Sequence, residues 1–387
     1  MKKIQEAQIE GKNVLVRIDM DIAIETKWTD GNTGQIVDDG RLRASIPTIK
    51  FLLEKGAAKI YIIGHLDRPR GIDFKHSLFP IANRLSGLLG FPQRFCKPEQ
   101  LYELNEKIII FENLRFNPGE EKNNPEFAKE LAQDKDLFVQ DAFATCHRSH
   151  ASTVGIKNIL PSYIGLSVQK EVENLTKLVG ENDLTIIIGG RKAKDKLPVI
   201  ENLASKTRVF LIGGVVANTF LKVSGYDVGK SLVETEIVEK TKEIFESQKN
   251  KIKLPVDVVI SKSFAHPEAQ KVLNVTELNK GLMTDFYIVD IGPETIKIFK
   301  NEIFEAQTIF INGNLGVSEV PEFSPGTREI AQAIVDAKAQ KYAGGGDTTS
   351  FIRKNHLEDK FDFLSNGGGA TLEFLAGKKL PGLEALK

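Results

Sequence analysis

Arginine and histidine side chains follow short apolar runs at several distant places in the first half of the chain. Such runs are typical of buried strands, and open α/β sheets bind ligands beyond the carboxyl ends of their strands. Guanidinium groups bind carboxylate and phosphate through paired hydrogen bonds. A single arginine in this position would more often form a surface ion pair, but several at equivalent strand ends predict a site for a small, multiply charged anion. The segments concerned are Arg17–Asp21, Gly64–Pro69, Glu112–Phe116 and Asp141–His150, and Arg41 is expected to join them from a loop.

Glycine takes the place of these basic residues after the strands of the second half. It lets a backbone approach a ligand closely and adopt positive φ, and N–H groups that open a helix face phosphate. One glycine pair could simply cap a helix. Five glycine segments along one sheet edge instead predict a bound nucleotide. They are Gly189-Gly190, Gly213-Gly214, Asn312–Gly316, Gly344–Asp347 and Gly367–Gly369.

Two lysines and an aspartate near these glycines are candidates for phosphate and metal chemistry. Lys192 and Lys196 are spaced i,i+4 and would share one face of a helix. A solvated basic helix end is the alternative interpretation. Asp347 follows three glycines and precedes Thr348, which suits a magnesium-phosphate site, although a helix N-cap explains it equally well.

The elements that would position these residues alternate between strand and helix along the whole chain. This alternation predicts an α/β fold with parallel sheets and helices on both faces. The predicted strands are Val14–Ile18, Lys59–Ile63, Ile108–Phe111, Leu137–Val139, Thr185–Ile188, Val209–Ile212, Val256–Ile260, Thr308–Ile311 and Phe361–Leu364. The predicted helices include Ile46–Lys55, Glu126–Gln133, Leu197–Lys206 and Thr327–Lys338.

The length of 387 residues predicts two domains. The segment Gln169–Val179 has helical apolar spacing and is followed by a break at Glu181–Asp183. We therefore expect a first domain at 1–168, a connecting helix at 169–180 and a second domain at 181–365.

Composition narrows the function class. Lysine plus arginine equals aspartate plus glutamate, at 52 each, which argues against a dedicated nucleic-acid binder. The N-terminal residues lack the apolar stretch of a secretory signal, and no run of about 18 apolar residues predicts a membrane span. Only Cys96 and Cys146 occur, without metal-ligand spacing, which fits a reducing cytoplasm. We expect small-molecule substrates, no nucleic-acid or membrane partner, and a monomer.

Several long stretches of the chain have distinctive residue patterns. They are ENLRFNPGEEKNNPEFAKELA at 112–132, HRSHASTVG at 147–155, ANTFLK at 217–222, GKSLVE at 229–234, LPVDVV at 254–259, DIGPETI at 290–296, GGGDT at 344–348 and NGGGATLEFLAGKKLPG at 366–382. These stretches resemble the phosphoglycerate kinase family. The resemblance implies two Rossmann-like domains joined by a helix and hinge, with phosphoglycerate on the first domain and nucleotide on the second. It also implies that the C-terminal segment, 366–387, returns to the first domain.

The family motifs imply a role for individual residues. The implied substrate-binding residues are Asp19, Met20, Asp21, Arg41, His65, Leu66, Asp67, Arg68, Arg115 and Arg148. The implied nucleotide-binding residues are Gly190, Lys196, Gly213, Gly214, Asn312, Glu319, Gly345, Gly346, Asp347 and Thr348. Arg41, Lys192, Gly367 and Gly368 would act on the transferring phosphoryl group, and Mg²⁺ would be held near Asp347.

Four departures from the family patterns occur at these sites. Asp21 stands where an asparagine is usual, and HLGRP is replaced by HLDRP with Asp67. GGAKVSDK is replaced by GGRKAKDK, and NGPxG is replaced by NGNLG with Asn314. The expected activity is phosphoryl transfer between 1,3-bisphosphoglycerate and ADP. The alternatives are a catalytically weak paralogue with a binding or scaffold role, and an α/β kinase for another small phosphorylated acid.

Overall fold

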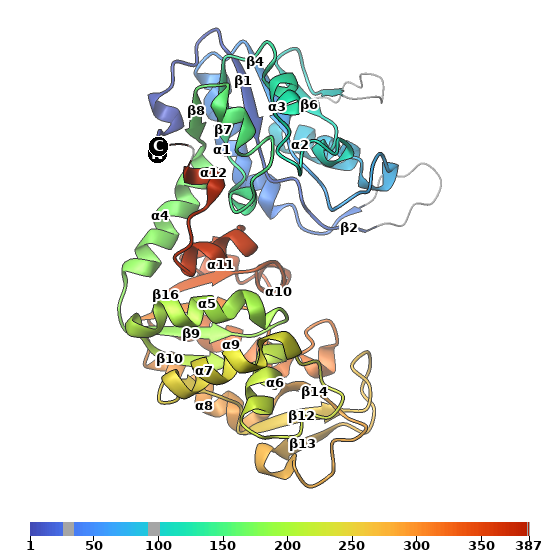
Figure 1. The fold of residues 1–387 in the computed structure, drawn as a ribbon, viewed down its shortest axis with the longest axis vertical. Helices are drawn as coiled ribbons and strands as arrows, with labels where there is room; N and C mark the ends of the chain where they lie inside the picture. Colours follow the sequence, from blue (N-terminus) through green and yellow to red (C-terminus); the bar gives the residue numbers. More distant parts are fainter. Residues whose placement is uncertain (26–34, 92–100, 385, 387) are drawn as a thin grey trace. The chain divides into compact units, whose positions relative to one another are not determined.

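Short strands buried on both faces form the centre of each half of the chain. The computed structural model describes residues 1–25, 35–91, 101–384 and 386, so Cys96 lies outside the described residues. Two compact units can be distinguished: Met1–Glu173 together with Lys379–Lys387, and Asn174–Lys378 (Figure 1).

The sheet of the first unit has the strand order β5-β6-β4-β1-β7-β8. All of its described strands are parallel except β5, which runs antiparallel to β6 at the edge. The strands are β1 (Asn13–Arg17), β4 (Lys59–Ile63), β5 (Leu101–Glu103), β6 (Ile108–Phe111), β7 (Leu137–Gln140) and β8 (Ser162–Ile164). A two-stranded ribbon of β2 (Ile24–Glu25) and β3 (Gln35–Ile36) lies outside this sheet.

Helices cover both faces of this sheet because successive strand side chains point to opposite sides. Val14 and Val16 pack with α1 (Gly40–Glu54) and α2 (Phe79–Leu89), whereas Leu15 packs with α3 (Pro125–Ala132). Helix α3 begins where the Asn124 side chain accepts the N–H groups of the first turn.

The main sheet of the second unit is parallel throughout its described strands, in the order β11-β10-β9-β15-β16-β17. These strands are β9 (Leu184–Ile188), β10 (Thr207–Ile212), β11 (Ile252–Lys253), β15 (Thr308–Asn312), β16 (Gln340–Gly344) and β17 (Phe363–Ser365). Its helices are α5 (Ala193–Leu203), α6 (Gly214–Val223), α7 (Val238–Gln248), α8 (Pro293–Phe304), α9 (Pro325–Asp336), α10 (Gly346–Lys354) and α11 (Gly369–Leu375). The predicted α/β class with two parallel sheets is therefore confirmed.

One predicted strand belongs to a different sheet. The run at 256–260 forms β12 (Asp257–Ser261), which pairs antiparallel with β13 (Lys271–Asn274) and β14 (Tyr287–Ile291). An apolar run indicates burial but does not show the direction of the partner strand. This small sheet supplies one wall of the cavity described below.

The connecting helix predicted at 169–180 lies within helix α4 (Leu166–Gly180). At the C-terminus, α11 packs against α5 in the second unit, and the chain joins the first unit only from Lys379 onward. There Gly382, within α12 (Pro381–Glu384), donates its N–H to the Cys146 carbonyl at 2.7 Å. Within the described residues, no helix is both long and apolar enough to span a bilayer.

Candidate active site

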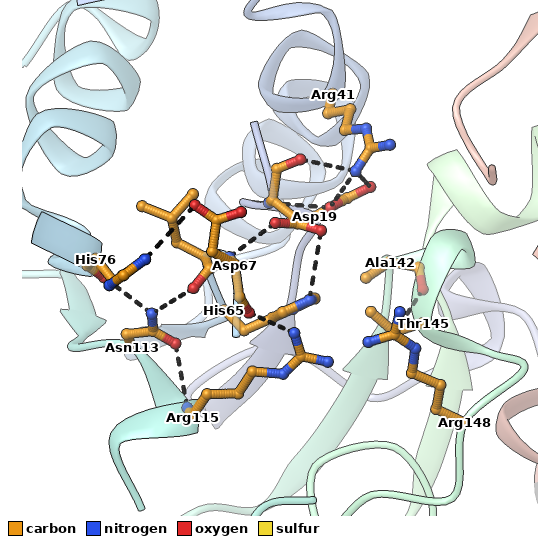
Figure 2. Close-up of polar contacts among 12 residues, drawn as sticks. Asp19, Arg41, His65, Asp67, His76, Asn113, Arg115, Ala142, Thr145 and Arg148 are labelled. Carbon is orange, nitrogen blue, oxygen red and sulfur yellow. Dashed lines mark hydrogen bonds and ion pairs between the residues drawn. The ribbon is translucent and has the colours of Figure 1, made fainter. Parts of the chain in front are cut away.

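Basic side chains from separate elements gather beyond the carboxyl ends of β1, β4, β6 and β7 (Figure 2). These four strands are neighbours in the sheet, so the segments that follow them lie at one edge. Arg115 lies in a single 3₁₀ turn, and Arg148 follows another such turn after β7. The predicted convergence of basic residues is therefore present in the structure.

Arg41 reaches this edge from the first turn of α1, not from a loop as the sequence suggested. Its Nη1 lies 3.3 Å from Asp19 Oδ2 and donates to the Asp21 carbonyl at 2.8 Å. The negative charge of Asp19 raises the pKa of Arg41. Burial raises the pKa of Asp19, and the charge of Arg41 only partly opposes this. Arg41 therefore stays charged and is aimed by the acidic loop after β1.

His65 is buried beneath the same edge and is neutral at pH 7. Burial lowers the pKa of His65 well below its usual value, and the positive charge of Arg17 adds to the effect. Its Nδ1 lies 3.4 Å from Arg17 Nη2, which can only donate, so Nδ1 is the acceptor. The proton then resides on Nε2, which lies 3.7 Å from Asp21 Oδ2.

Within the described part of the chain, two arginines at this edge lack a close acidic partner. Burial lowers the pKa of Arg115, and repulsion from Arg148 lowers it further. Burial also lowers the pKa of Arg148, with repulsion from Arg68 as the next cause. Arg115 has an ion pair with Glu121 at 3.1 Å, but Arg68 and Arg148 have no acidic partner within 4 Å among the described residues. The cluster is thus suited to a multiply charged anion.

Arg17, which the sequence placed among the arginines of the anion site, instead forms a buried ion pair that supports this cluster. Its partner Glu120 was not singled out from the sequence. Arg17 is 1% exposed, and its Nη1 lies 3.2 Å from Oε1 of Glu120, which is fully buried. The nearby His150, the charge of Arg17 and the hydrogen bonds from Ser152 lower the pKa of Glu120 to about 2, against the opposing effect of burial. The Arg17 charge is therefore already compensated, and Arg17 is a support rather than a ligand. No short-range pattern links positions 17 and 120, because only the fold brings them together.

The Asp67 loop is held by backbone contacts. Asp67 adopts a left-handed φ of 52°. Its N–H donates to Asp21 Oδ1 at 2.9 Å, and its carbonyl accepts a hydrogen bond from Arg115 Nη1. Met20 and Leu66 are buried in the core, so any contact that they make with a ligand would come from their backbone.

The glycine loops of the second unit pack tightly against one another. Gly190 donates its N–H to the Asn314 carbonyl at 2.6 Å, and Gly214 donates to the Leu315 carbonyl at 3.0 Å. A Cβ on Gly214, which has a φ of 58°, would lie 2.5 Å from the Gly190 nitrogen. Part of the glycine pattern therefore reflects loop–loop packing and not only approach to a ligand.

A cavity of about 530 Å³ opens beside these loops, within the second unit. Four of the predicted nucleotide residues line it, namely Gly190, Gly214, Glu319 and Asp347. Apolar side chains form much of the remaining wall, and sequence reasoning missed them because several come from the antiparallel sheet and the loops beside it. They include Val215, Leu221, Leu232, Val258, Phe264 and Val289.

Large apolar side chains at the cavity are unusually exposed. Leu232 is 55% exposed and Phe264 is 53% exposed, and Phe264 also makes an edge-on contact with Tyr287. Exposed apolar residues that line a concave surface indicate contact with a flat or apolar group. The cavity thus combines an apolar wall with Asp347 and glycine backbone, as a nucleotide requires.

The two predicted lysines do not share a helix face. Helix α5 begins at Ala193, and Lys192 precedes it in a left-handed conformation with φ 61° and ψ 60°. Lys196 is 5% exposed, and its Nζ donates to the carbonyls of Gly189 and Arg191. Burial lowers the pKa of Lys196 to about 8. Lys192 is the exposed lysine of the pair, whereas Lys196 holds the loop from within.

Several other predicted nucleotide residues form the framework around Asp347. Asn312 Nδ2 donates to the Gly344 carbonyl at 2.9 Å, and Thr348 Oγ1 accepts the Gly313 N–H at 2.7 Å. Gly345 needs glycine because its φ is 96° and a Cβ would lie 2.9 Å from Asn312 Nδ2. Gly213 and Gly346 are not among the residues that line the cavity.

Asp347 lies exposed in the first turn of α10. No cluster of three or more metal-ligating side chains occurs in the described part of the chain. Mg²⁺ commonly binds through one or two carboxylates together with substrate phosphates. Asp347 and Glu319 are exposed carboxylates that line the nucleotide-sized cavity, so its carboxylates are few enough to fit that mode.

The last predicted catalytic segment opens helix α11. Gly367 already donates its N–H to Ser365 Oγ at 3.2 Å. Gly368 has a φ of 53° and forms the N-cap of α11. Of this pair, Gly368 is therefore the better candidate for an N–H that faces a ligand.

Comparison with known proteins agrees with this arrangement. A sequence model of the family described as phosphoglycerate kinase matches residues 4–378. The chain is 42% identical to the phosphoglycerate kinase of Dictyoglomus turgidum, with 99% of this chain and 98% of the relative covered. It is 41% identical to that of Finegoldia magna, with 100% and 98% covered.

Solved structures give the same result. The phosphoglycerate kinase of Pyrococcus horikoshii has a TM-score of 0.84 at 32% identity, with 100% of this chain and 98% of that chain covered. The enzyme of Coxiella burnetii has a TM-score of 0.81 at 35% identity, with 99% and 98% covered. The match extends over almost the entire length and includes both the basic edge and the glycine loops, so the chain belongs to the phosphoglycerate kinase family.

Proposed function

We propose that this chain transfers a phosphoryl group reversibly between 1,3-bisphosphoglycerate and ADP, giving 3-phosphoglycerate and ATP. The observation that carries the proposal is the pairing of two different sites in one chain. The first unit has a cluster of arginines, two of which have no ion pair among the described residues, and the second has a nucleotide-sized cavity with an exposed aspartate.

Phosphoglycerate carries a carboxylate and a phosphate, and the basic edge offers groups for both. Arg68, Arg115 and Arg148 would bind the anionic groups, because guanidinium forks match their geometry. Neutral His65 would contribute hydrogen bonding without further charge. Asp19 and Asp21 would accept hydrogen bonds from the substrate hydroxyl while aiming Arg41, with Asp67 and the backbone of Met20 and Leu66 shaping the loops.

The nucleotide would lie in the cavity of the second unit. Its base would contact the apolar wall, and Glu319 would accept hydrogen bonds from the ribose. Asp347 would bind Mg²⁺, which would neutralise charge on the nucleotide phosphates. Asn312, Thr348 and Lys196 would keep the surrounding loops in place, and Gly190, Gly214 and Gly345 would allow backbone approach.

The transfer itself needs positioning more than proton chemistry. The carboxylate of 3-phosphoglycerate is a good leaving group, so the protein mainly aligns the reacting oxygens and neutralises charge on the transferring group. Arg41 and Lys192 would bind that group, with the Gly368 N–H as a further donor. Because the two ligands bind to separate units, we infer a hinge closure that brings them together.

A coupled assay with 3-phosphoglycerate, ATP and Mg²⁺ tests the proposal. Turnover that requires all three, and that falls sharply when 3-phosphoglycerate is replaced by other small phosphorylated acids, is expected. Calorimetric binding of both ligands without turnover would instead favour a scaffold role, and faster turnover of another acid would favour a different kinase. We also propose a cytoplasmic monomer, which sedimentation at several concentrations would test.

A further inference from the structure

Lys192 lies in a backbone conformation that its side chain disfavours. Its φ of 61° and ψ of 60° are in the left-handed region, where the Cβ of an L-residue approaches the following carbonyl oxygen. Such conformations persist when surrounding contacts hold them in place. The contacts on either side of Lys192 therefore decide where its ammonium group points.

Glu234 supplies the contacts on the C-terminal side of Lys192. It lies 40 residues after Lys194 in the sequence. Its Oε1 accepts the Ala193 N–H at 2.6 Å, and its Oε2 accepts the Lys194 N–H at 3.0 Å. These N–H groups belong to the first turn of α5 and have no acceptor within the helix. Each carboxylate oxygen thus binds one of the two peptide groups directly after Lys192.

Lys196 supplies the contacts on the other side. Its buried ammonium donates to the carbonyls of Gly189 and Arg191, the second of these at 2.7 Å. The ammonium of Lys196 therefore holds the peptide group before Lys192, and the carboxylate of Glu234 holds the peptide group after it. Lys192 itself is exposed.

We propose that Glu234 is a positioning residue for the phosphoryl-transfer step and acts through Lys192. The inference rests on the proposed role of Lys192 in transfer and extends it to a residue outside the cavity lining. A carboxylate is required because both of its oxygens accept, whereas an amide has only one acceptor. Losing Glu234 would free the Lys192 backbone to leave the left-handed conformation and would move its ammonium group away from the transferring phosphoryl group.

A double-mutant cycle tests this coupling. The variants are Lys192→Ala, Glu234→Ala and the double variant, each characterised by kcat, by the KM of both substrates and by Tm. Lys192→Ala should lower kcat by about 10²–10³-fold. Glu234→Ala should lower kcat by at least about tenfold with little change in either KM, and the double variant should match Lys192→Ala within about twofold, because the two residues act as one unit.

Two further variants separate positioning from ordinary helix capping. Glu234→Gln keeps one acceptor and should give an intermediate kcat, which also serves if Glu234→Ala fails to fold. Asn124→Ala is the matched control, because the Asn124 side chain accepts two first-turn N–H groups of α3, at 2.9 and 3.1 Å. It should lower Tm with kcat unchanged.

The outcomes distinguish the inference from the function on which it rests. A large effect of Lys192→Ala with an unchanged kcat in both Glu234 variants, or with independent additive effects in the double variant, would overturn the positioning role alone. A small effect of Lys192→Ala would overturn its assignment to transfer, and the inference with it. A kcat loss in Asn124→Ala equal to that in Glu234→Ala would identify a general stability effect and also overturn the inference.

Discussion

The carboxylate of Asp21 accepts a hydrogen bond from the backbone N–H of Asp67, with a distance of 2.9 Å between the two atoms. The relationship joins the loop after β1 to the loop after β4, and it involves two of the positions at which the chain departs from the family patterns. Asp21 therefore has a structural partner, while its negative charge remains near the arginines of the basic edge.

We predict that Asp21→Asn lowers the KM for 3-phosphoglycerate by about tenfold and changes kcat little. The asparagine oxygen can still accept the Asp67 N–H, so the loop should stay in place. The lost negative charge would otherwise repel the anionic substrate, by roughly 4 kcal/mol at 4 Å and an effective dielectric near 20 before arginines and solvent offset it. Steady-state kinetics measures both constants, and an unchanged or higher KM would mean that the arginines fully compensate Asp21.

Arg41→Ala should lower kcat by about 10²–10³-fold while changing the KM for either substrate much less. The reason is that Arg41 would act mainly on charge that develops during transfer. Arg43→Ala is a matched control on the same helix, because Arg43 is exposed and pairs with Asp39 at 2.7 Å. An effect of tenfold or less in Arg41→Ala, or an equal effect in both variants, would remove Arg41 from the transfer step.

Asp141 makes stability depend on pH in an unusual direction. It is 1% exposed and accepts the Ser167 N–H of α4 at 2.9 Å. Burial raises its pKa to about 7 from an ordinary value of 3.8. The folded state therefore holds the proton more tightly than the unfolded chain, and this stabilisation is present below about pH 4 and lost as the pH rises through 7.

The corresponding prediction compares Asp141→Asn with the natural chain across pH. Asparagine can still accept the Ser167 N–H but never ionises. Its Tm relative to that of the natural chain should therefore increase as the pH is raised from 4 to 8, by several degrees. Calorimetry at matched ionic strength measures this difference, and a pH-independent difference would show that Asp141 does not titrate in this range.

The sequence predicted the main strands well because each is a short apolar run buried on both faces. It did not predict β16, since Gln340–Gly344 contains only two apolar side chains, Tyr342 and Ala343. The sequence also did not predict the antiparallel pairing of β12, because the direction of pairing depends on segments far away in the chain.

At the site, residue types were predictable but exact placement was not. Several arginines after parallel strands indicated an anion site, yet the i,i+4 spacing of Lys192 and Lys196 suggested a shared helix face. The left-handed conformation of Lys192 places it before the helix instead. The buried pair of Arg17 and Glu120 also had no local signal, because tertiary packing alone brings the two side chains together.

The central claim is that phosphoglycerate binds to the first unit and nucleotide to the second. Calorimetry on Arg148→Ala and Glu319→Ala, each titrated separately with 3-phosphoglycerate and with ADP and Mg²⁺, tests it most directly. Arg148→Ala should raise the Kd for 3-phosphoglycerate at least tenfold and leave the Kd for ADP unchanged, and Glu319→Ala should do the reverse. The assignment of the two ligands to separate units would be contradicted if either variant weakened the binding of both ligands equally. It would also be contradicted if neither variant selectively weakened the binding of one ligand.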